Sequence, residues 1–503
     1  MMNEPLPCAS LLPPHSFSSF SFVPQVADVE KPRNCLEAAM VTSRHPHARV
    51  ISIDPSPALA LPGVHGYFDH NDLAPRALGG NPGGASHAGW VKGKSAGTAA
   101  AGVRPETRAE DNKDRVFADG LVTCVGMAIG IIVAETAALA RRAALLVVVE
   151  YEVLPSCLSI AEAEEQGRFH PYDHCVANGD VEAALATAPR TLSGGLHVGA
   201  QEHFYLEPHA IMCIPGETFG EMEVISMTQC VTKSARCVAG CLGVSENKVR
   251  CVVKRIGGGF GGKETLSVYR SGAIAVAAAK TKRAVRLVIS REEDMGISGQ
   301  SHPFVGTWTV GFDAQGKLVA ADVNLTNDAG CSKCCSDVVM DRGVAHWVNA
   351  YSFGAVRVKG KLAHTHLPSN TAFRGFGVPQ SAIICEDMLE AVAASLGHPN
   401  ADAVRAINLI PAAGCRLPYG QLVSPCHAPR IVRELRASSD LVSRRAAVLA
   451  FNAAHRWRKR GLALVPTCYG GSSSLYSFSP APPSPATHSR SPLIIPAPPP
   501  TRS

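Results

Sequence analysis

A glycine-rich loop is the part of the sequence whose residue types and spacing most clearly suggest chemistry. It spans residues 257–264 and reads Gly-Gly-Gly-Phe-Gly-Gly-Lys-Glu. Because glycine has no side chain, the backbone N–H groups of such a loop can approach a ligand closely. A helix predicted directly after it would favour an anionic group at the helix N-terminus. The loop is therefore a candidate ligand site, with a tight structural turn as the alternative.

Two nucleotide-binding patterns fit this loop in part. The pattern G-x-G-x-x-G runs from Gly257 to Gly262 after a predicted strand, but the acidic pair at 292–293 comes about 35 positions after its start, later than the usual ~20. A P-loop pattern fits through Lys263, but Glu264 stands where a Ser or Thr would bind magnesium. Since a carboxylate there would repel phosphate, we favour neither nucleotide reading.

A second loop, residues 369–380, alternates polar, aromatic and glycine residues before a predicted helix. It reads Ser-Asn-Thr-Ala-Phe-Arg-Gly-Phe-Gly-Val-Pro-Gln. Phe373 and Phe376 suit a hydrophobic core, but Arg374 between them needs an anionic or carbonyl partner if it is buried. Because aromatic ring faces and guanidinium planes both stack, the loop suits a flat aromatic ligand.

Two further segments carry residue types that bind metals. His203 lies in residues 201–207, Gln-Glu-His-Phe-Tyr-Leu-Glu, where a lone histidine is more often structural than a ligand. Cys331, Cys334 and Cys335 form the one tight cysteine cluster of the sequence. A zinc site would need a second ligand pair nearby, and an iron–sulfur site would need four suitably spaced thiolates. We therefore interpret both segments as structural.

The composition disfavours several classes of protein. The chain has 503 residues, 46% hydrophobic and 18% charged, which favours about three folded units. No apolar run approaches the ~20 residues of a membrane helix. Residues 1–10 lack the charged start and apolar run of a secretory signal. The 17 cysteines are scattered, so we expect reduced thiols and no disulfide scaffold.

The net charge of +6 is concentrated in one segment. Residues 430–460 carry nine Lys or Arg against Glu434 and Asp440, whereas the remainder of the chain is close to neutral. Such a run is more often the solvated face of helices than a nucleic-acid surface. We therefore expect no nucleic-acid partner.

Composition also divides the chain into segments. Residues 1–35 and 471–503 are rich in Pro and Ser, and residues 79–101 are rich in Gly and Ala. We expect disordered ends and an inserted loop. Two globular blocks lie between them, at 36–165 and 180–470.

Hydrophobic periodicity and turn residues predict the elements that position the two loops. The first block is predicted to hold strands at 48–53, within 121–134 and at 150–154, with a helix at 135–148. The second is predicted to hold strands at 221–227, 249–256 and 284–289, helices at 265–280 and 379–396, and a hairpin from 304 to 325. The last helix has Pro379 in its first turn and Gly397 just beyond its end.

Taken together, three segments in this order resemble the molybdenum hydroxylases of the xanthine dehydrogenase and aldehyde oxidase family. They are residues 199–207, 257–264 and 369–380, and the shorter segments 117–126 and 456–463 are also similar to that family. The resemblance runs from about 36 to 470, interrupted by the Gly/Ala insertion. It implies an α+β fold in which a small α/β hammerhead-type domain precedes the first half of a molybdopterin-binding domain, with disordered ends.

The resemblance also implies a cofactor, a molybdenum–pyranopterin, and hydroxylation of a purine with oxygen from water. Gln229 matches a glutamine that donates a hydrogen bond to a molybdenum oxygen ligand. Phe260 and Gly261 match the glycine-loop residues beside the metal, and Arg374 matches an arginine whose backbone lies near the cofactor. Gln229, Phe260 and Arg374 would therefore make up the molybdenum environment.

The resemblance assigns substrate binding to three more residues. Glu264 and Arg342 match the two groups that hold the purine, and Phe376 matches a ring that packs against it. Attack on the purine pushes negative charge into the ring, which a guanidinium stabilises without proton transfer. A carboxylate hydrogen-bonds ring nitrogens and assists tautomerisation. Related aldehyde oxidases generally lack this charged pair, so its presence favours hypoxanthine and xanthine over aldehydes, with Glu264 and Arg342 as catalytic candidates.

Several features of the family have no counterpart in this sequence. The family's general base lies in the second half of the molybdenum domain, which the resemblance does not reach, so no residue is assigned that role. The 2Fe-2S and FAD domains are also absent. Cys230, Val378 and Met127 stand where the family usually has Asn, Gly and Gln. The chain therefore resembles an internal fragment of a longer enzyme, and we expect it to be inactive alone.

Three functions stay open for this chain. One is an oxidoreductase of this family, which in full-length form implies a homodimer in the cytoplasm, or alternatively in peroxisomes, with NAD or oxygen as electron acceptor. The second is a non-catalytic product that associates with a full-length subunit. The third is a nucleic-acid binder acting through residues 430–460.

Overall fold

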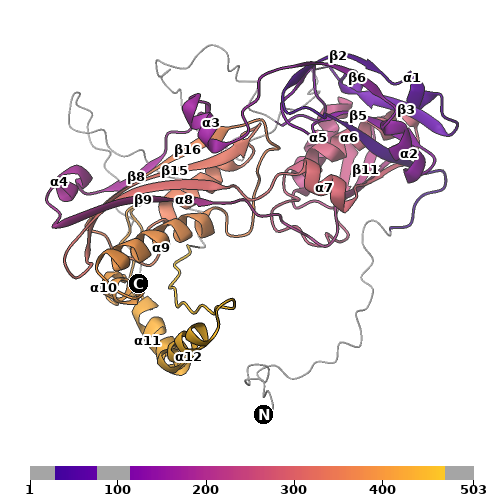
Figure 1. Cartoon of the computed structure of the whole chain (residues 1–503). Coiled ribbons are helices and arrows are strands. Elements are labelled where there is room, and N and C mark those ends of the chain that lie inside the picture. Colours follow the sequence, from indigo (N-terminus) through magenta and orange to yellow (C-terminus); the bar gives the residue numbers. More distant parts are fainter. Residues whose placement is uncertain (1–28, 76–113, 471–503) are drawn as a thin grey trace, which may run out of the picture.

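The chain folds into two lobes, each built on its own β-sheet (Figure 1). The computed structural model describes residues 29–75 and 114–470. Helices make up 31% and strands 26%, so the predicted α+β class is confirmed. The disorder predicted for the two ends and the insertion predicted at 79–101 lie outside the described residues, apart from residues 29–35. None of the helices in the described ranges has the length and apolar content needed to cross a membrane.

The first lobe contains a seven-stranded sheet with the order β12-β11-β10-β13-β1-β5-β3. In chain order the strands are β1 (Leu36–Thr42), β3 (Val64–Asp69), β5 (Ala128–Ala134), β10 (Ala210–Pro215), β11 (Met222–Ser226), β12 (Val249–Val252) and β13 (Val285–Val288). Strand β1 pairs parallel with β13, with Leu36 opposite Val285. The sheet therefore joins strands from both of the predicted globular blocks.

Helices pack against this sheet and form the core of the lobe. They are α5 (Val231–Leu242) and α6 (Leu266–Thr281), and the short helix α7 (Arg291–Ile297) contributes Ile297 at the edge of this core. Helix α6 is apolar around most of its circumference and is buried along most of its length, as expected for a helix enclosed by protein on all sides. Because α6 follows the glycine loop directly, this buried helix fixes the position of the loop.

A smaller layer lies at the outer edge of the first lobe. Its three-stranded sheet has the order β4-β2-β6. The layer consists of β2 (Ala48–Asp54), β4 (Leu121–Val122), β6 (Val148–Val153), α1 (Ser56–Leu59), α2 (Ala137–Ala144) and the short 3₁₀ turn η2 (His70–Asp72), while a second 3₁₀ turn, η5 (Glu246–Lys248), precedes β12. The predicted helix at 135–148 is shorter in the structure, because Thr136 caps its start and β6 takes over from Val148.

The second lobe is built on a long, strongly hydrogen-bonded sheet with the order β7-β16-β15-β14-β9. Its strands are β7 (Phe169–His170), β9 (Arg190–Val198), β14 (Phe304–Phe312), β15 (Leu318–Gly330) and β16 (Ala355–His364), with β8 (Cys175–Asn178) also paired to β16. The predicted hairpin of β14 and β15 is confirmed, with Phe304 opposite Asn327.

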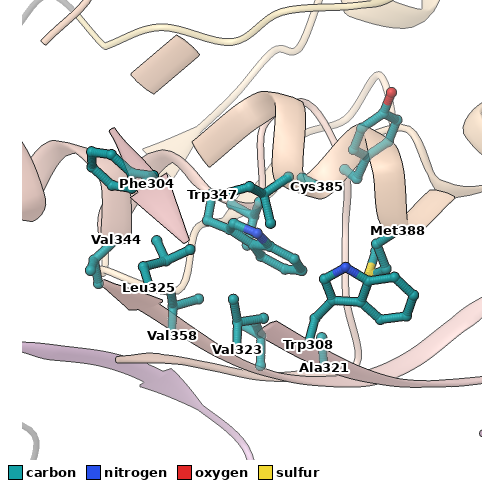
Figure 2. Close-up of a cluster of buried hydrophobic side chains, with 14 of the residues drawn as sticks. Phe304, Trp308, Ala321, Val323, Leu325, Val344, Trp347, Val358, Cys385 and Met388 are labelled. Atoms are coloured by element: carbon teal, nitrogen blue, oxygen red, sulfur yellow. The ribbon is translucent and has the colours of Figure 1, made fainter. Parts of the chain in front are cut away.

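Helices cover both faces of this second sheet. Helices α8 (Ser336–His346) and α9 (Val378–Ser395) pack on one face, and α3 (Ile160–Glu165) and α4 (Val181–Ala186) on the other. Figure 2 shows Trp347 beside Val323 and Trp308 in the core under α8 and α9. Alternation along β15 explains the two layers, since Ala321 faces this core and Ala320 faces α4.

The remaining elements follow α9 at the end of the described chain. They are α10 (Asp402–Asn408), the hairpin of β17 (Cys415–Arg416) and β18 (Leu422–Val423), α11 (Ala428–Ser438) and α12 (Leu441–Ala454). Arg445 of α12 forms an ion pair with Asp402 of α10. Helices α11 and α12 lie below the second lobe in Figure 1. They carry five of the nine basic residues of 430–460, and the other four follow the end of α12 in an exposed segment.

Candidate functional site

The two glycine-containing loops meet where the lobes join. The carbonyl of Phe260 in the glycine loop accepts a hydrogen bond from the backbone N–H of Arg374, with N and O 3.0 Å apart. At Gly261 the backbone has φ +105°, and an added Cβ would stand 2.1 Å from the carbonyl oxygen of Ala372. Glycine is therefore required at this position, both for the dihedral angle and for the close approach of the two backbones.

A buried histidine makes a second link between the loops. The ring Nε2 of His203 lies 2.7 Å from the carbonyl oxygen of Ala372, and the ring packs against Phe373 with centroids 4.9 Å apart. Burial lowers the pKa of His203, which favours the neutral ring that donates to this carbonyl. These contacts support the structural role predicted for His203.

Gln229 lies between β11 and α5 with its side chain exposed beside the glycine loop. Its side-chain Oε1 accepts hydrogen bonds from the backbone N–H groups of Gly261 (2.9 Å) and Lys263 (3.3 Å). The backbone N–H of Gln229 donates to the backbone carbonyl of Lys263 (2.8 Å). Because two donors identify Oε1 as the amide oxygen, the amide Nε2 is left as the donor group of the side chain. The glycine loop therefore orients Gln229 as a hydrogen-bond donor.

Two other predicted site residues are exposed at the same junction. Phe260 has φ +51° and a side chain 45% exposed, and the Arg374 side chain is exposed as well. An exposed aromatic ring held in the left-handed backbone region is strained. The structure therefore brings together Gln229, Phe260, Gly261 and Arg374.

Phe376 belongs to the tight turn that follows Arg374. Its N–H donates to the carbonyl of Phe373 (2.7 Å), and its φ is +54°. The half-buried ring packs against the core of the second lobe. Phe376 therefore lies beside the junction, with its ring supported from behind by that core.

Glu264 ends the glycine loop and is half-buried. Its backbone N–H donates to Gly261 (3.1 Å). Its carboxylate lies close to the thiols of Cys230 and Cys335. Burial raises the pKa of Cys230, and the negative charge of Glu264 raises it further. The same charge contributes to the raised pKa of Cys335, where the hydrogen bond that Cys335 donates to Cys334 and burial are the larger causes. Glu264 therefore lies near the start of α8.

Arg342 is carried by α8, the helix that begins directly after Cys335. Its Nη1 donates to the backbone carbonyl of Gly470, 3.0 Å away. One turn earlier on the same helix, Val339 packs against Gly377, the neighbour of Phe376. Arg342 is therefore one helical turn from the second loop, and it is bonded to a segment far along the chain whose role the motifs did not indicate.

Behind the glycine loop lies a buried charged group that sequence analysis did not assign. The side chain of Lys263 has no exposed surface. Its ammonium donates to the carbonyl of Ile256 and lies over the ring of Tyr205, 4.7 Å from the centroid. Burial lowers its pKa to about 8, although Glu207 and Asp294 act in the opposite direction. Lys263 points into the protein, so it cannot reach a phosphate in the way a P-loop lysine does.

The junction has the chemistry that a molybdenum–pyranopterin group would need. A bound group that carries oxygen ligands requires oriented donors and a close backbone approach. Gln229 supplies a fixed amide donor, and Gly261 allows an approach that any side chain would block. Among the described residues, no group of three or more His, Cys, Asp or Glu side chains is arranged to hold a metal ion directly. The fit therefore rests on hydrogen bonds and shape.

Comparison with family models identifies two domains in the chain. Residues 25–91 and 89–155 match the aldehyde oxidase and xanthine dehydrogenase a/b hammerhead domain. Residues 164–409 match the molybdopterin cofactor-binding domain. These matches agree with the order of domains that the sequence motifs predict.

Curated relatives are similar to most of this chain. Xanthine dehydrogenase of Oryza sativa subsp. japonica is 39% identical over 446 residues, which is 88% of this chain and 30% of the relative. Xanthine dehydrogenase/oxidase of Mus musculus is 38% identical over 448 residues, 89% of this chain and 31% of the relative. The chain therefore spans about 30% of the length of the curated relatives that it matches.

Solved structures share the fold at low sequence identity. Quinoline 2-oxidoreductase from Pseudomonas putida 86 superposes with a TM-score of 0.73 at 22% identity, covering 85% of this chain and 53% of that chain. Aldehyde oxidoreductase from Desulfovibrio gigas gives a TM-score of 0.70 at 24% identity, covering 82% and 44%. At these identities the likeness concerns the fold alone.

The loop contact at Gly261 generates a first prediction. Gly261→Ala places a Cβ against the Ala372 carbonyl at a positive φ, so we expect the free energy of unfolding to fall by about 2–4 kcal/mol. Gly296→Ala is the matched control, because a Cβ there meets open space near the end of α7, and alanine is favoured over glycine in helices. Urea unfolding followed by circular dichroism measures both variants, and equal stabilities would contradict the proposed constraint.

The buried ammonium of Lys263 generates a prediction about pH. Its pKa is about 8 in the folded chain, against an ordinary value of 10.5, so between these values the unfolded chain binds more protons than the folded one. The free energy of unfolding should therefore rise with pH across this window, by up to ~3 kcal/mol for this group. Lys263→Met removes the effect while keeping the side-chain length.

The measurement for Lys263 is the difference in unfolding free energy between wild type and Lys263→Met at pH 7.5 and at pH 10.5. Other titrating groups contribute equally to both proteins, so they cancel. The wild type should gain stability relative to the variant as the pH rises. A difference that does not change with pH would show that burial does not lower the pKa of Lys263.

Proposed function

Because the chain belongs to the aldehyde oxidase and xanthine dehydrogenase family, we propose that it supplies one wall of the active site of a molybdenum-dependent purine hydroxylase. The molybdenum–pyranopterin group, when bound, would supply oxygen derived from water and accept the electrons of the oxidation. The chain's own residues then have two tasks, to hold that group and to hold the purine.

The orientation of Gln229 is the observation that carries this proposal. Two backbone N–H groups of the glycine loop occupy its carbonyl oxygen, so its amide nitrogen is directed to donate. A donor fixed before the ligand arrives costs little reorganisation on binding. Phe260 and Arg374, both exposed at the junction, would lie against the same group.

The purine would lie between Glu264, Arg342 and Phe376. The ring of Phe376 would set the plane of the purine, since aromatic rings favour offset stacking or edge contacts. Glu264 would accept hydrogen bonds from ring N–H groups, and the Arg342 guanidinium would stabilise negative charge as the ring is attacked. A purine held by Arg342 would take the place of the Gly470 carbonyl that the guanidinium contacts in this structure.

The substrate class rests on the charged pair together with the relatives. Curated relatives carry the names xanthine dehydrogenase and xanthine dehydrogenase/oxidase. A carboxylate and a guanidinium suit a heterocycle that both donates and accepts hydrogen bonds, whereas an aldehyde offers one acceptor. We therefore propose hypoxanthine and xanthine as substrates. The 2Fe-2S and FAD groups, the electron acceptor (NAD or oxygen), homodimer formation and a cytoplasmic location are proposed for the longer protein.

A second candidate function has its own supporting observation. The chain spans about 30% of its relatives, and large apolar side chains are exposed beside the junction, namely Phe204 (67%) and Leu206 (83%). Exposed apolar clusters of this kind mark surfaces that another part of a protein covers. The chain would then act only in association with a longer subunit.

The cofactor part of the proposal predicts a defect in Gln229→Ala. The 503-residue chain would be produced in cells that make the molybdenum–pyranopterin group, and molybdenum per chain measured by mass spectrometry. Losing one oriented hydrogen bond of ~1–1.5 kcal/mol should reduce retention by about 5–10-fold under dilution. Gln315→Ala, in the exposed turn between β14 and β15, is the control and should retain wild-type molybdenum.

The same experiment separates the two candidate functions. Molybdenum in the wild-type chain alone supports the first. Molybdenum found only after co-expression with a full-length xanthine dehydrogenase, together with co-purification of the two chains, supports the second. Wild-type retention in Gln229→Ala would contradict the role of Gln229 in either case.

The substrate part of the proposal predicts weaker xanthine binding in Glu264→Gln. A hydrogen bond to a charged group contributes about 1.5–3 kcal/mol, so the dissociation constant for xanthine should rise about 10–100-fold. Titration calorimetry on the molybdenum-loaded chain measures this, with exposed Glu292→Gln as the charge-matched control. An unchanged affinity for xanthine in Glu264→Gln would remove Glu264 from the site.

A further inference from the structure

Two cysteines from opposite lobes meet beside the junction. Cys124 lies in the turn between β4 and β5 of the first lobe, and Cys331 follows β15 in the second. Both side chains are buried, at 7% and 9% exposure, both line one cavity, and each thiol shifts the pKa of the other. Both thiols are reduced in this structure. The two residues are about 200 positions apart in the chain, so this contact is a product of the fold.

Hydrogen bonds hold the Cys331 side of the contact in place. Its sulfur lies 3.4 Å from the hydroxyl oxygen of Ser369, and that hydroxyl contacts the side chain of Ser332 (2.7 Å). The carboxylate of Asp114, from the first lobe, accepts from Ser369 (3.1 Å) and from Ser332. Residues of both lobes therefore fix the position of Cys331.

A cavity of about 90 Å³ reaches both thiols. It is lined by Cys124, Cys331 and polar side chains such as Thr123 and Ser369, together with apolar groups including Met127. A space of that size exceeds the ~10–15 Å³ that one water molecule requires. The cavity therefore has room for a small polar oxidant beside the two cysteines.

We propose that Cys124 and Cys331 form a reversible disulfide that locks the two lobes together. The oxidant is a peroxide: one thiolate attacks it, the O–O bond breaks, and a sulfenic acid and one water form. The second thiol then displaces the hydroxyl group of the sulfenic acid as a second water. The two sulfurs lose two electrons and two protons, and hydrogen peroxide is reduced to two waters.

The electrostatics favour Cys331 as the attacking sulfur. A hydrogen bond from Cys124 lowers the pKa of Cys331, and contacts with Ser369 and Thr123 act in the same direction. Burial and the negative charge of Asp114 oppose this lowering. Cys124 shows the converse, because sharing its proton with Cys331 raises its pKa. Cys331 is therefore suited to attack the peroxide, and Cys124 is suited to react with the resulting sulfenic acid.

Other close thiol pairs in the described chain cannot join the lobes. Cys237 lies close enough to Cys241 to raise its pKa, but both residues lie on the same helix, α5. Cys334 and Cys335 are adjacent in sequence. A bond at Cys331 would have wider effects, because Cys331 precedes α8 with Arg342, and its partner Ser369 begins the loop that carries Arg374.

Peptide mapping of the full chain tests the proposal directly. The folded chain would be treated with hydrogen peroxide, quenched in acid, alkylated and digested with trypsin. Cleavage after Arg115, Arg141, Lys317 and Lys333 gives peptides 116–141 and 318–333, which carry only Cys124 and only Cys331. We expect these two peptides to be recovered linked, and dithiothreitol to separate them.

Single variants and stability measurements complete the test. Cys331→Ser should abolish the linked pair, whereas Cys175→Ser, at a half-buried cysteine of β8, should leave it intact. Peroxide should raise the Tm of the wild type by several degrees, because linking distant positions constrains the unfolded chain, and this shift should vanish in Cys331→Ser.

Two results would overturn the proposal. One is recovery of both peptides with alkylated thiols after peroxide treatment of the folded chain. The other is a bond from Cys331 to any cysteine other than Cys124, such as Cys334 or Cys335 in the neighbouring tryptic peptide. The wild-type map decides the matter even if a serine variant fails to fold.

Discussion

The close approach of two backbones at Gly261 and Ala372 is the constraint on which the remainder of the site depends. The glycine loop belongs to one lobe and the 369–380 loop to the other, and no side chain fits between them. Because the contact leaves little freedom, it sets the distance between residues that the two lobes contribute separately. Gln229 and Phe260 come from one side of it, and Arg374 and Phe376 from the other. A site assembled in this way is only as well ordered as the junction.

The glycine loop has two faces with opposite requirements. The outer face presents the Gln229 amide and the Phe260 ring, whereas the inner face covers a buried lysine, its neighbouring carboxylate Glu207 and Tyr205. A buried ammonium is costly, and the carbonyl and ring that it contacts offset that cost only in part, which is why its pKa falls. The contacts of Lys263 on the inner face therefore hold the loop in shape, and Gln229 and Phe260 on the outer face are available for binding.

Local patterns predicted the parts of the fold whose cause is local. Pro379 and Gly397 marked the ends of α9 to within one or two residues, and the turn at residues 313–316 identified the hairpin of β14 and β15. The strand predicted to run to residue 256 ends at Val252 instead, because the chain leaves the sheet early to form the glycine loop. The division into two blocks at about residue 165 stays a prediction, and the seven-stranded sheet crosses it, since pairing between distant strands leaves no local pattern.

The candidate site was predictable to the same degree. Family-like motifs supplied Gln229, Glu264, Arg342 and the two loops, and the structure joins four of the seven residues through the loop junction. No motif signalled the contact between Arg342 and Gly470 or the inward direction of Lys263, because both depend on tertiary packing.

The parallel pairing of β1 with β13 has a consequence for how the chain comes to be folded. Strand β1 lies between β5, which is made soon after it, and β13, which begins about 250 residues later. During synthesis the early strands can pair with one another, but one edge of β1 stays open until residue 285 has left the ribosome. Open edges of apolar strands attract other strands, and contacts so distant in sequence form slowly. The first lobe is therefore exposed to misassembly for as long as the ribosome takes to reach its last strand.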